Sequence, residues 1–122
     1  MDGTLVVTPV ACAVPGRAPG DPKLSGTLPV HLRPGSLAHR IYGRTPIAEE
    51  YFCNFDASPA LQARLTEGGL SIAGTAEDGT VRIVERPEHP FFLATAFLPQ
   101  LSSAPGKPHP VIVAYLRAAN RC

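Results

Sequence analysis

Apolar and polar positions alternate over short stretches of the chain, which is typical of strands rather than of long helices. The longest stretch with this character that also contains several aromatic residues runs from Phe91 to Phe97, the densest apolar run in the sequence. It follows a Pro-His-Pro type corner, and we predict that it forms a core strand. The strands predicted from these patterns cover residues 5–14, 26–32, 47–56, 70–74, 80–85 and 91–97.

Three short helices are predicted from start and stop signals. Ser36 can cap a helical turn that Gly43 ends. Ser58-Pro59 begins a second helix that stops at Gly68-Gly69, and a third covers residues 111–120. The apolar residues expected on their inner sides are Leu37 and Ile41 in the first, Leu61 and Leu65 in the second, and Ile112, Tyr115, Leu116 and Ala119 in the third.

Turn-forming residues separate these elements. The chain has 14 prolines and 11 glycines in 122 residues, a length that fits one domain with a modest core. The segment 15–25 is expected to be an exposed, mobile loop, and Glu77-Asp78-Gly79 a hairpin turn. A run of strands with short helices predicts a strand-rich sheet protein of the α/β or α+β class.

The charge pattern excludes several classes of protein. The formal net charge is +1, with no cluster of Lys or Arg of the kind that binds nucleic acid or anionic membranes. Apolar runs are far shorter than the ~20 residues of a membrane helix. The acidic Asp2 stands where a signal peptide carries positive charge, so we expect a cytoplasmic protein. Cysteines and histidines are scattered, so we expect no disulfide framework, no metal site and no cofactor.

From Arg33 onward, the order of motifs resembles the C-terminal half of the glutamine amidotransferase domain of CTP synthase, a class I amidotransferase. This resemblance implies an α/β, flavodoxin-like half-domain with a mixed sheet, and residues 1–122 as a single partial domain. The matching motifs are Arg33-Pro34-Gly35-Ser36-Leu37-Ala38, Ile41-Tyr42-Gly43, Gly69-Leu70-Ser71-Ile72-Ala73-Gly74-Thr75, Asp78-Gly79, Glu85-x-x-x-His89-Pro90-Phe91-Phe92, Phe97-x-Pro99 and Ser102-x-x-Pro105-Gly106-Lys107-Pro108-x-Pro110.

The same resemblance implies that the catalytic groups are missing. Amidotransferases of this class use a Cys in G-x-C-x-G, a His that deprotonates it and a Glu that orients the His. No G-x-C-x-G occurs here, and the His and Glu positions hold Leu98 and Gln100. The Arg that would bind the glutamine carboxylate aligns with Asn54. We therefore expect glutaminase activity to be absent.

A closer resemblance is to a small bacterial family described as CTP synthase C-terminal region-related (seleno)proteins, which share Tyr51-x-Cys53-Asn54-Phe55. Selenium normally replaces a reactive sulfur, so Cys53 is a candidate catalytic thiol; the alternative is a small, buried core residue. The candidate ligand pocket consists of Asn54, Leu98, Gln100 and His89, although His89 also fits a structural His-Pro corner. Cys12 is expected to pack in a strand and Cys122 to be exposed. Arg40, Tyr42 and Arg44 are expected to lie on the solvated surface.

Three functional hypotheses remain open. The first is an accessory or ligand-binding pseudoenzyme that keeps the amidotransferase scaffold without its triad. The second is a thiol enzyme in which Cys53 is the nucleophile or redox centre acting on a small metabolite. The third is an assembly module that completes its sheet by forming a homodimer or by pairing with a partner chain. None of the three calls for nucleic acid or a membrane as a partner.

Overall fold

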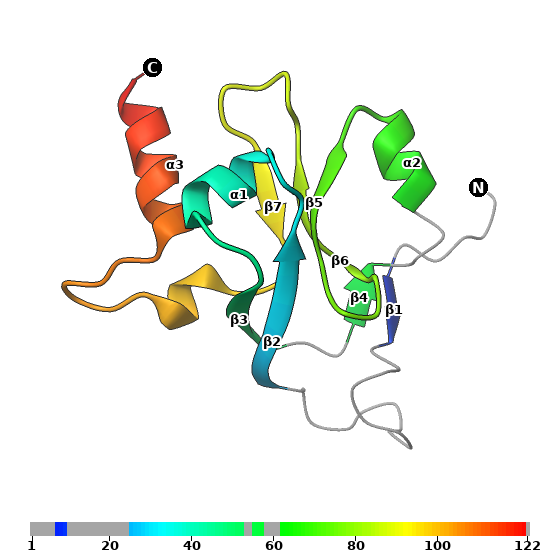
Figure 1. The fold of residues 1–122 in the computed structure, drawn as a ribbon, viewed down its shortest axis with the longest axis horizontal. Coiled ribbons are helices and arrows are strands. Elements are labelled where there is room, and N and C mark those ends of the chain that lie inside the picture. Colours follow the sequence, from blue (N-terminus) through cyan, green and yellow to red (C-terminus); the bar gives the residue numbers. More distant parts are fainter. Residues whose placement is uncertain (1–6, 10–24, 53–54, 58–61, 122) are drawn as a thin grey trace.

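The computed structural model describes residues 7–9, 25–52, 55–57 and 62–121 (Figure 1). Short strands alternate with short helices along this part of the chain. In order, the elements are β1 (Val7–Pro9), β2 (Ser25–Leu32), α1 (Leu37–Tyr42), β3 (Ile47–Phe52), β4 (Phe55–Ala57), α2 (Gln62–Glu67), β5 (Ser71–Thr75), β6 (Val81–Glu85), β7 (Leu93–Thr95), the 3-10 helix η2 (Pro99–Ser102) and α3 (Pro110–Asn120).

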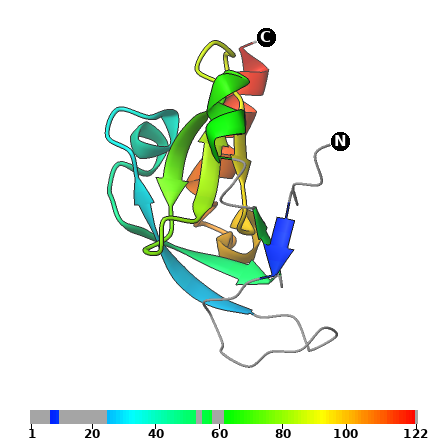
Figure 2. The same cartoon turned by 90° about the vertical axis from the view of Figure 1, so that its right-hand side faces the viewer.

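Five of the strands form one curled sheet in the order β3-β2-β5-β6-β7, and β1 pairs with β4 in a separate two-stranded sheet (Figure 2). Helix α1 contacts both α3 and β5, while α2 contacts β5 from the other side (Figure 1). The strand-rich α/β fold with short helices is confirmed. Every strand pair in the described residues is antiparallel, however, where a mixed sheet was expected. The connections from β5 to β6 and from β6 to β7 are too short for the crossover that parallel strands require.

Helix α1 begins and ends where its signals predict. The hydroxyl of Ser36 accepts a hydrogen bond from the His39 backbone N–H at 3.1 Å, and Gly43 ends the helix in the left-handed conformation at φ 70°. The predicted inner residues, Leu37 and Ile41, are only half-buried. The face toward the core instead carries Ala38, which is fully buried. The caps determine the length of the helix. Which of its faces points toward the core depends on how the helix packs on the sheet.

The hydrophobic core lies between α1 and the concave part of the five-stranded sheet. Its buried members are Val30, Leu32, Ala38, Ile47, Ala73, Ile83 and Phe97. The prediction of a core strand over 91–97 was wrong in extent, because only Leu93–Thr95 is a strand and Phe92 is 40% exposed. Strand β7 is at the edge of the sheet, where only one neighbour covers it, so the core receives little more of this run than Phe97.

Helix α3 also differs from its predicted packing. Val111 in the first turn is buried, whereas Tyr115 and Leu116 are more than half exposed. The helix contacts α1 and η2 (Figure 1), and the ring of Tyr115 meets the ring of Phe91 at 5.8 Å between centroids. The rest of the fold therefore covers the predicted apolar face of this helix only in part. No helix among the described residues has both the length and the apolar character needed to cross a bilayer.

The predicted strand 47–56 is divided into β3 and β4. Ser25, which was assigned to the mobile loop, is the first residue of β2 because it pairs with Phe52. Several predictions lie outside the described residues: the rest of the strand 5–14 and of the loop 15–25, the residues Cys12, Cys53, Asn54 and Cys122, and the start of the second helix with Leu61.

Candidate functional site

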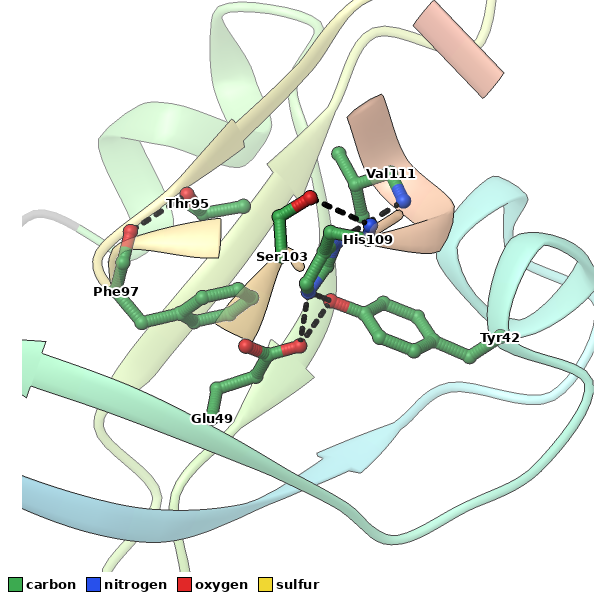
Figure 3. Close-up of polar contacts among 7 residues, drawn as sticks. All are labelled: Tyr42, Glu49, Thr95, Phe97, Ser103, His109 and Val111. Atoms are coloured by element: carbon green, nitrogen blue, oxygen red, sulfur yellow. Dashed lines mark hydrogen bonds and ion pairs between the residues drawn. The ribbon is translucent and has the colours of Figure 1, made fainter. Parts of the chain in front are cut away.

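A buried group of three titratable side chains lies where α1, β3 and the start of α3 meet (Figure 3). The carboxylate oxygen Oε1 of Glu49 is 2.7 Å from the Tyr42 hydroxyl and 2.6 Å from His109 Nε2. The Tyr42 hydroxyl is 3.4 Å from the same His109 nitrogen, and the two rings meet edge to face. We call Tyr42, Glu49 and His109 the buried triad.

The hydrogen bonds of His109 define its tautomer. Its Nδ1 accepts a hydrogen bond from the Val111 backbone N–H at 3.1 Å, so Nδ1 carries no proton. The ring proton is therefore on Nε2, which donates to Glu49. His109 is also the residue that caps α3, and its own backbone N–H donates to the Ser103 hydroxyl at 3.1 Å. Both ring nitrogens are thus occupied by structural hydrogen bonds.

Glu49 faces the interior because strand residues alternate between the two sides of a sheet. Ile47 and Glu49 are buried, whereas Ala48 between them is exposed. The oxygen Oε1 receives the Tyr42 and His109 protons, while Oε2 is buried without a hydrogen-bond partner among the described residues. The side chains of Glu49 and His109 are each 3% exposed, so solvent does not reach this carboxylate. Within the described residues, the triad is therefore a closed group of internal hydrogen bonds.

The segment around Leu98 is attached to β3, the strand that carries Glu49, by a backbone hydrogen bond. The Leu98 N–H donates to the Glu50 carbonyl at 3.0 Å, which holds the segment against β3. The Leu101 N–H then donates to the Leu98 carbonyl as η2 begins. The Leu98 side chain is half-buried and that of Gln100 is exposed. The backbone here is firmly held, but neither side chain supplies a titratable group.

Comparison with known proteins shows which proteins this chain is similar to. No protein-family model matches the chain. A CTP synthase from Methanothrix thermoacetophila is 42% identical over 93 residues, covering 76% of this chain and 17% of that protein. A CTP synthase from Acidobacterium capsulatum is 44% identical over 89 residues, covering 72% of this chain and 16% of that protein. The chain thus spans less than a fifth of the length of these relatives.

A solved structure gives the corresponding fold. The glutaminase domain of Trypanosoma brucei CTPS, with bound acivicin, superposes with a TM-score of 0.83 at 25% sequence identity. The match covers 95% of this chain and 46% of that one. The chain is homologous to a C-terminal part of the CTP synthase glutaminase domain. The resemblance of the motifs to the glutamine amidotransferase domain of CTP synthase is therefore confirmed, whereas the closer resemblance to the (seleno)protein family stays a prediction.

The structure separates the candidate ligand-pocket residues of the CTP synthase-like chain. Leu98 and Gln100 lie at the start of η2, whereas His89 lies in the turn between β6 and β7 and lines a cavity that neither of them reaches. In that turn the His89 N–H donates to the Arg86 carbonyl, and its Nδ1 accepts from the Phe91 N–H at 3.1 Å. Cys53 and Asn54 lie outside the described residues.

Sequence analysis did not find the buried triad. Tyr42 was assigned to the solvated surface, which is wrong because its hydroxyl is turned toward Glu49 and its ring packs against the core. Glu49 was not singled out as a candidate, and His109 counted only among the scattered histidines. Two signals were available: the alternation of Ile47 and Glu49, which predicts one shared face, and the His-Pro pair that starts α3.

The position of Tyr42 predicts a loss of stability in alkaline solution. Burial of its phenol raises the pKa of Tyr42 far above its usual value, and the hydrogen bond to Glu49 and the negative charge of that carboxylate raise it further. Because the folded state holds the proton more tightly, stability is complete below the unfolded pKa of about 10 and decreases as the pH rises above it. Urea denaturation between pH 8 and 11 is expected to show this decrease.

Two phenylalanine variants make the measurement specific. Tyr42→Phe removes the phenol that ionises when the chain unfolds. The free energy of unfolding of this variant is therefore expected to fall less steeply with pH than that of the wild type. Tyr115→Phe is the matched control, since Tyr115 is 56% exposed and its substitution leaves the pH dependence unchanged. Parallel curves for the wild type and Tyr42→Phe would contradict this prediction.

Proposed function

We propose that the CTP synthase-like chain is a glutamine amidotransferase-like domain that does not hydrolyse glutamine and acts as an accessory or ligand-binding pseudoenzyme. The observation that carries this proposal is the pair Leu98 and Gln100 at the positions where the resemblance aligns the catalytic His and Glu. A leucine side chain accepts no proton, and a glutamine carries no charge that would stabilise an imidazolium.

The buried triad does not replace these groups. Its histidine, His109, uses Nδ1 for the Val111 N–H and Nε2 for Glu49, so neither nitrogen is available to a thiol. The ring is also buried, and a general base has to lie within hydrogen-bond reach of the proton it removes. Among the described residues, the group that looks most like a His-Glu pair is therefore a structural one.

The scaffold around the missing groups is intact, which supports a role in binding. The Leu98–Glu50 hydrogen bond attaches one end of the η2 segment to β3, and the Ser103–His109 hydrogen bond attaches the other end to His109. A segment that had lost its function altogether would be under no requirement to stay fixed in this way. The alternatives, a thiol enzyme based on Cys53 and an assembly module that forms a homodimer, stay predictions, as does the cytoplasmic location.

The test is an assay for glutaminase activity. We expect the purified chain to release no more ammonia from glutamine than the Cys53→Ser variant does, because Leu98 stands where the resemblance aligns the histidine that activates the thiol. A CTP synthase assayed in parallel confirms that the conditions support turnover. Ammonia release by the wild type above the rate of Cys53→Ser would refute the proposal, and it would direct attention to Cys53 as a working nucleophile.

A further inference from the structure

A cavity of about 270 Å³ lies beside the first turn of α1, away from the buried triad and from Leu98 and Gln100. Two loops form its walls: the turn that leads into α1 and the turn that follows β6. The lining residues that carry charge or can hydrogen-bond are Arg33, Ser36, Arg40, Glu85, Arg86 and His89. The cavity therefore brings together residues from two segments about fifty positions apart in the sequence.

Positive charge dominates this cavity. Arg33, Arg40 and Arg86 are exposed, and none of their guanidinium groups forms an ion pair within residues 7–9, 25–52, 55–57 and 62–121. Three cations around one small space repel each other unless an anion is present. Guanidinium groups also match the geometry of phosphate and carboxylate oxygens, which they bind through two parallel hydrogen bonds.

The single acid in the lining offsets one of these three cations, which leaves an excess of positive charge, and its two oxygens are already engaged. Glu85 is 3% exposed, and its two oxygens accept hydrogen bonds from the backbone N–H groups of Leu37 at 3.1 Å and Ala38 at 2.6 Å. Those two donors are consequently unavailable to a ligand. Any anion in this cavity would be held by the arginine side chains rather than by the start of α1.

The walls of the cavity are stiff before any ligand arrives. Pro87 and Pro90 restrict the turn that carries Arg86, and His89 binds that turn at both ends through the Arg86 carbonyl and the Phe91 N–H. Gly35 adopts φ 81°, and a Cβ atom at this position would meet nothing within 4 Å, so the backbone is open to the space above it. A preformed site of this kind loses little entropy on binding.

We propose that this cavity binds a small molecule through a dianionic phosphate group. Three guanidinium groups match the charge and the several acceptor oxygens of a phosphate better than those of a single carboxylate. The volume limits the occupant to a phosphate or a small phosphate monoester. This site shares no residue with the Leu98–Gln100 segment, so it is independent of the proposed loss of glutaminase activity.

The test is a titration of the full chain with inorganic phosphate at constant ionic strength, followed by the backbone ¹H–¹⁵N NMR spectrum. We expect saturable shifts in the amides of Arg33–Arg40 and Arg86–His89. Arg40→Gln and Arg86→Gln are each expected to weaken binding by roughly tenfold, the usual effect of losing a charge-assisted hydrogen bond. Arg117→Gln is the matched control, because Arg117 is an exposed arginine on α3 outside the cavity.

A second arm uses glycerol 3-phosphate in place of inorganic phosphate. Tighter binding of the monoester supports a site that also contacts the organic part, whereas equal binding supports a site for the phosphate group alone. Shifts that do not saturate, that sodium chloride reproduces, or that are the same in Arg40→Gln, Arg86→Gln and Arg117→Gln would overturn the proposal. The spectrum itself reports whether each variant is folded, so unfolding cannot be mistaken for lost affinity.

Discussion

Replacing Glu49 by Ala is expected to lower the free energy of unfolding by about 2–4 kcal/mol, because it leaves two hydrogen-bond donors in the interior without their acceptor. The Tyr42 hydroxyl and His109 Nε2 would both lose the oxygen to which they donate. They would be left with each other at 3.4 Å, a longer contact than either makes to Glu49. Urea denaturation at pH 7 measures the change.

Two further variants separate the loss of hydrogen bonds from the loss of charge. Glu49→Gln keeps a carbonyl oxygen in the Oε1 position, so it is expected to cost less than Glu49→Ala. Glu50→Ala changes the adjacent residue, whose side chain is only half-buried and whose carbonyl still accepts from Leu98. It is the matched control and should cost about 1 kcal/mol or less. Equal losses for Glu49→Ala and Glu50→Ala would rule out a stabilising role for the triad.

Replacing Glu85 by Ala is expected to cost about 2–4 kcal/mol, because it removes two hydrogen bonds from a buried carboxylate. The Leu37 and Ala38 N–H groups would lose their acceptor at the start of α1, and Ala38 is fully buried. Unfolding followed by a signal of the helix and unfolding followed by a signal of the sheet should show the same loss of free energy, because Glu85 connects the two elements.

The control for this prediction is Glu88→Ala. Glu88 lies three residues further along, in the same turn, and is exposed, so its substitution should change stability little. Glu85→Gln retains one acceptor oxygen and is expected to fall between the two. If Glu85→Ala is as stable as Glu88→Ala, water satisfies the two N–H groups as well as the carboxylate does, and the hydrogen bonds contribute nothing net.

The sequence was sufficient for features set by neighbouring residues. Ser36 and Gly43 define the ends of α1, and Asp78-Gly79 the turn between β5 and β6, because caps and turns depend on a few adjacent side chains. The order of the motifs was also sufficient for the homology to CTP synthase. Long-range packing was less accessible, as the exposed Tyr115 of α3 shows.

A hydrophobicity pattern does not indicate the buried triad, because His109 is distant in the chain from the other two members and all three are polar. Glu49 and His109 are 60 positions apart, and Tyr42 and His109 are 67 apart. Residues of these types are usually exposed, so a hydrophobicity pattern assigns each of them to the surface. Only the fold brings the three side chains together in the interior. There, each one supplies a hydrogen bond that offsets the cost of burying another.

The two hydrogen bonds of Glu85 determine how α1 can move. A helix of six residues is too short to be stable in isolation, so α1 persists only while the sheet holds its first turn. Opening α1 without disturbing β6 would leave the buried Glu85 carboxylate without its two hydrogen-bond donors. The helix and the strand therefore belong to one cooperative unit, and a phosphate bound between Arg40 and Arg86 would raise the free energy of local unfolding of both by mass action.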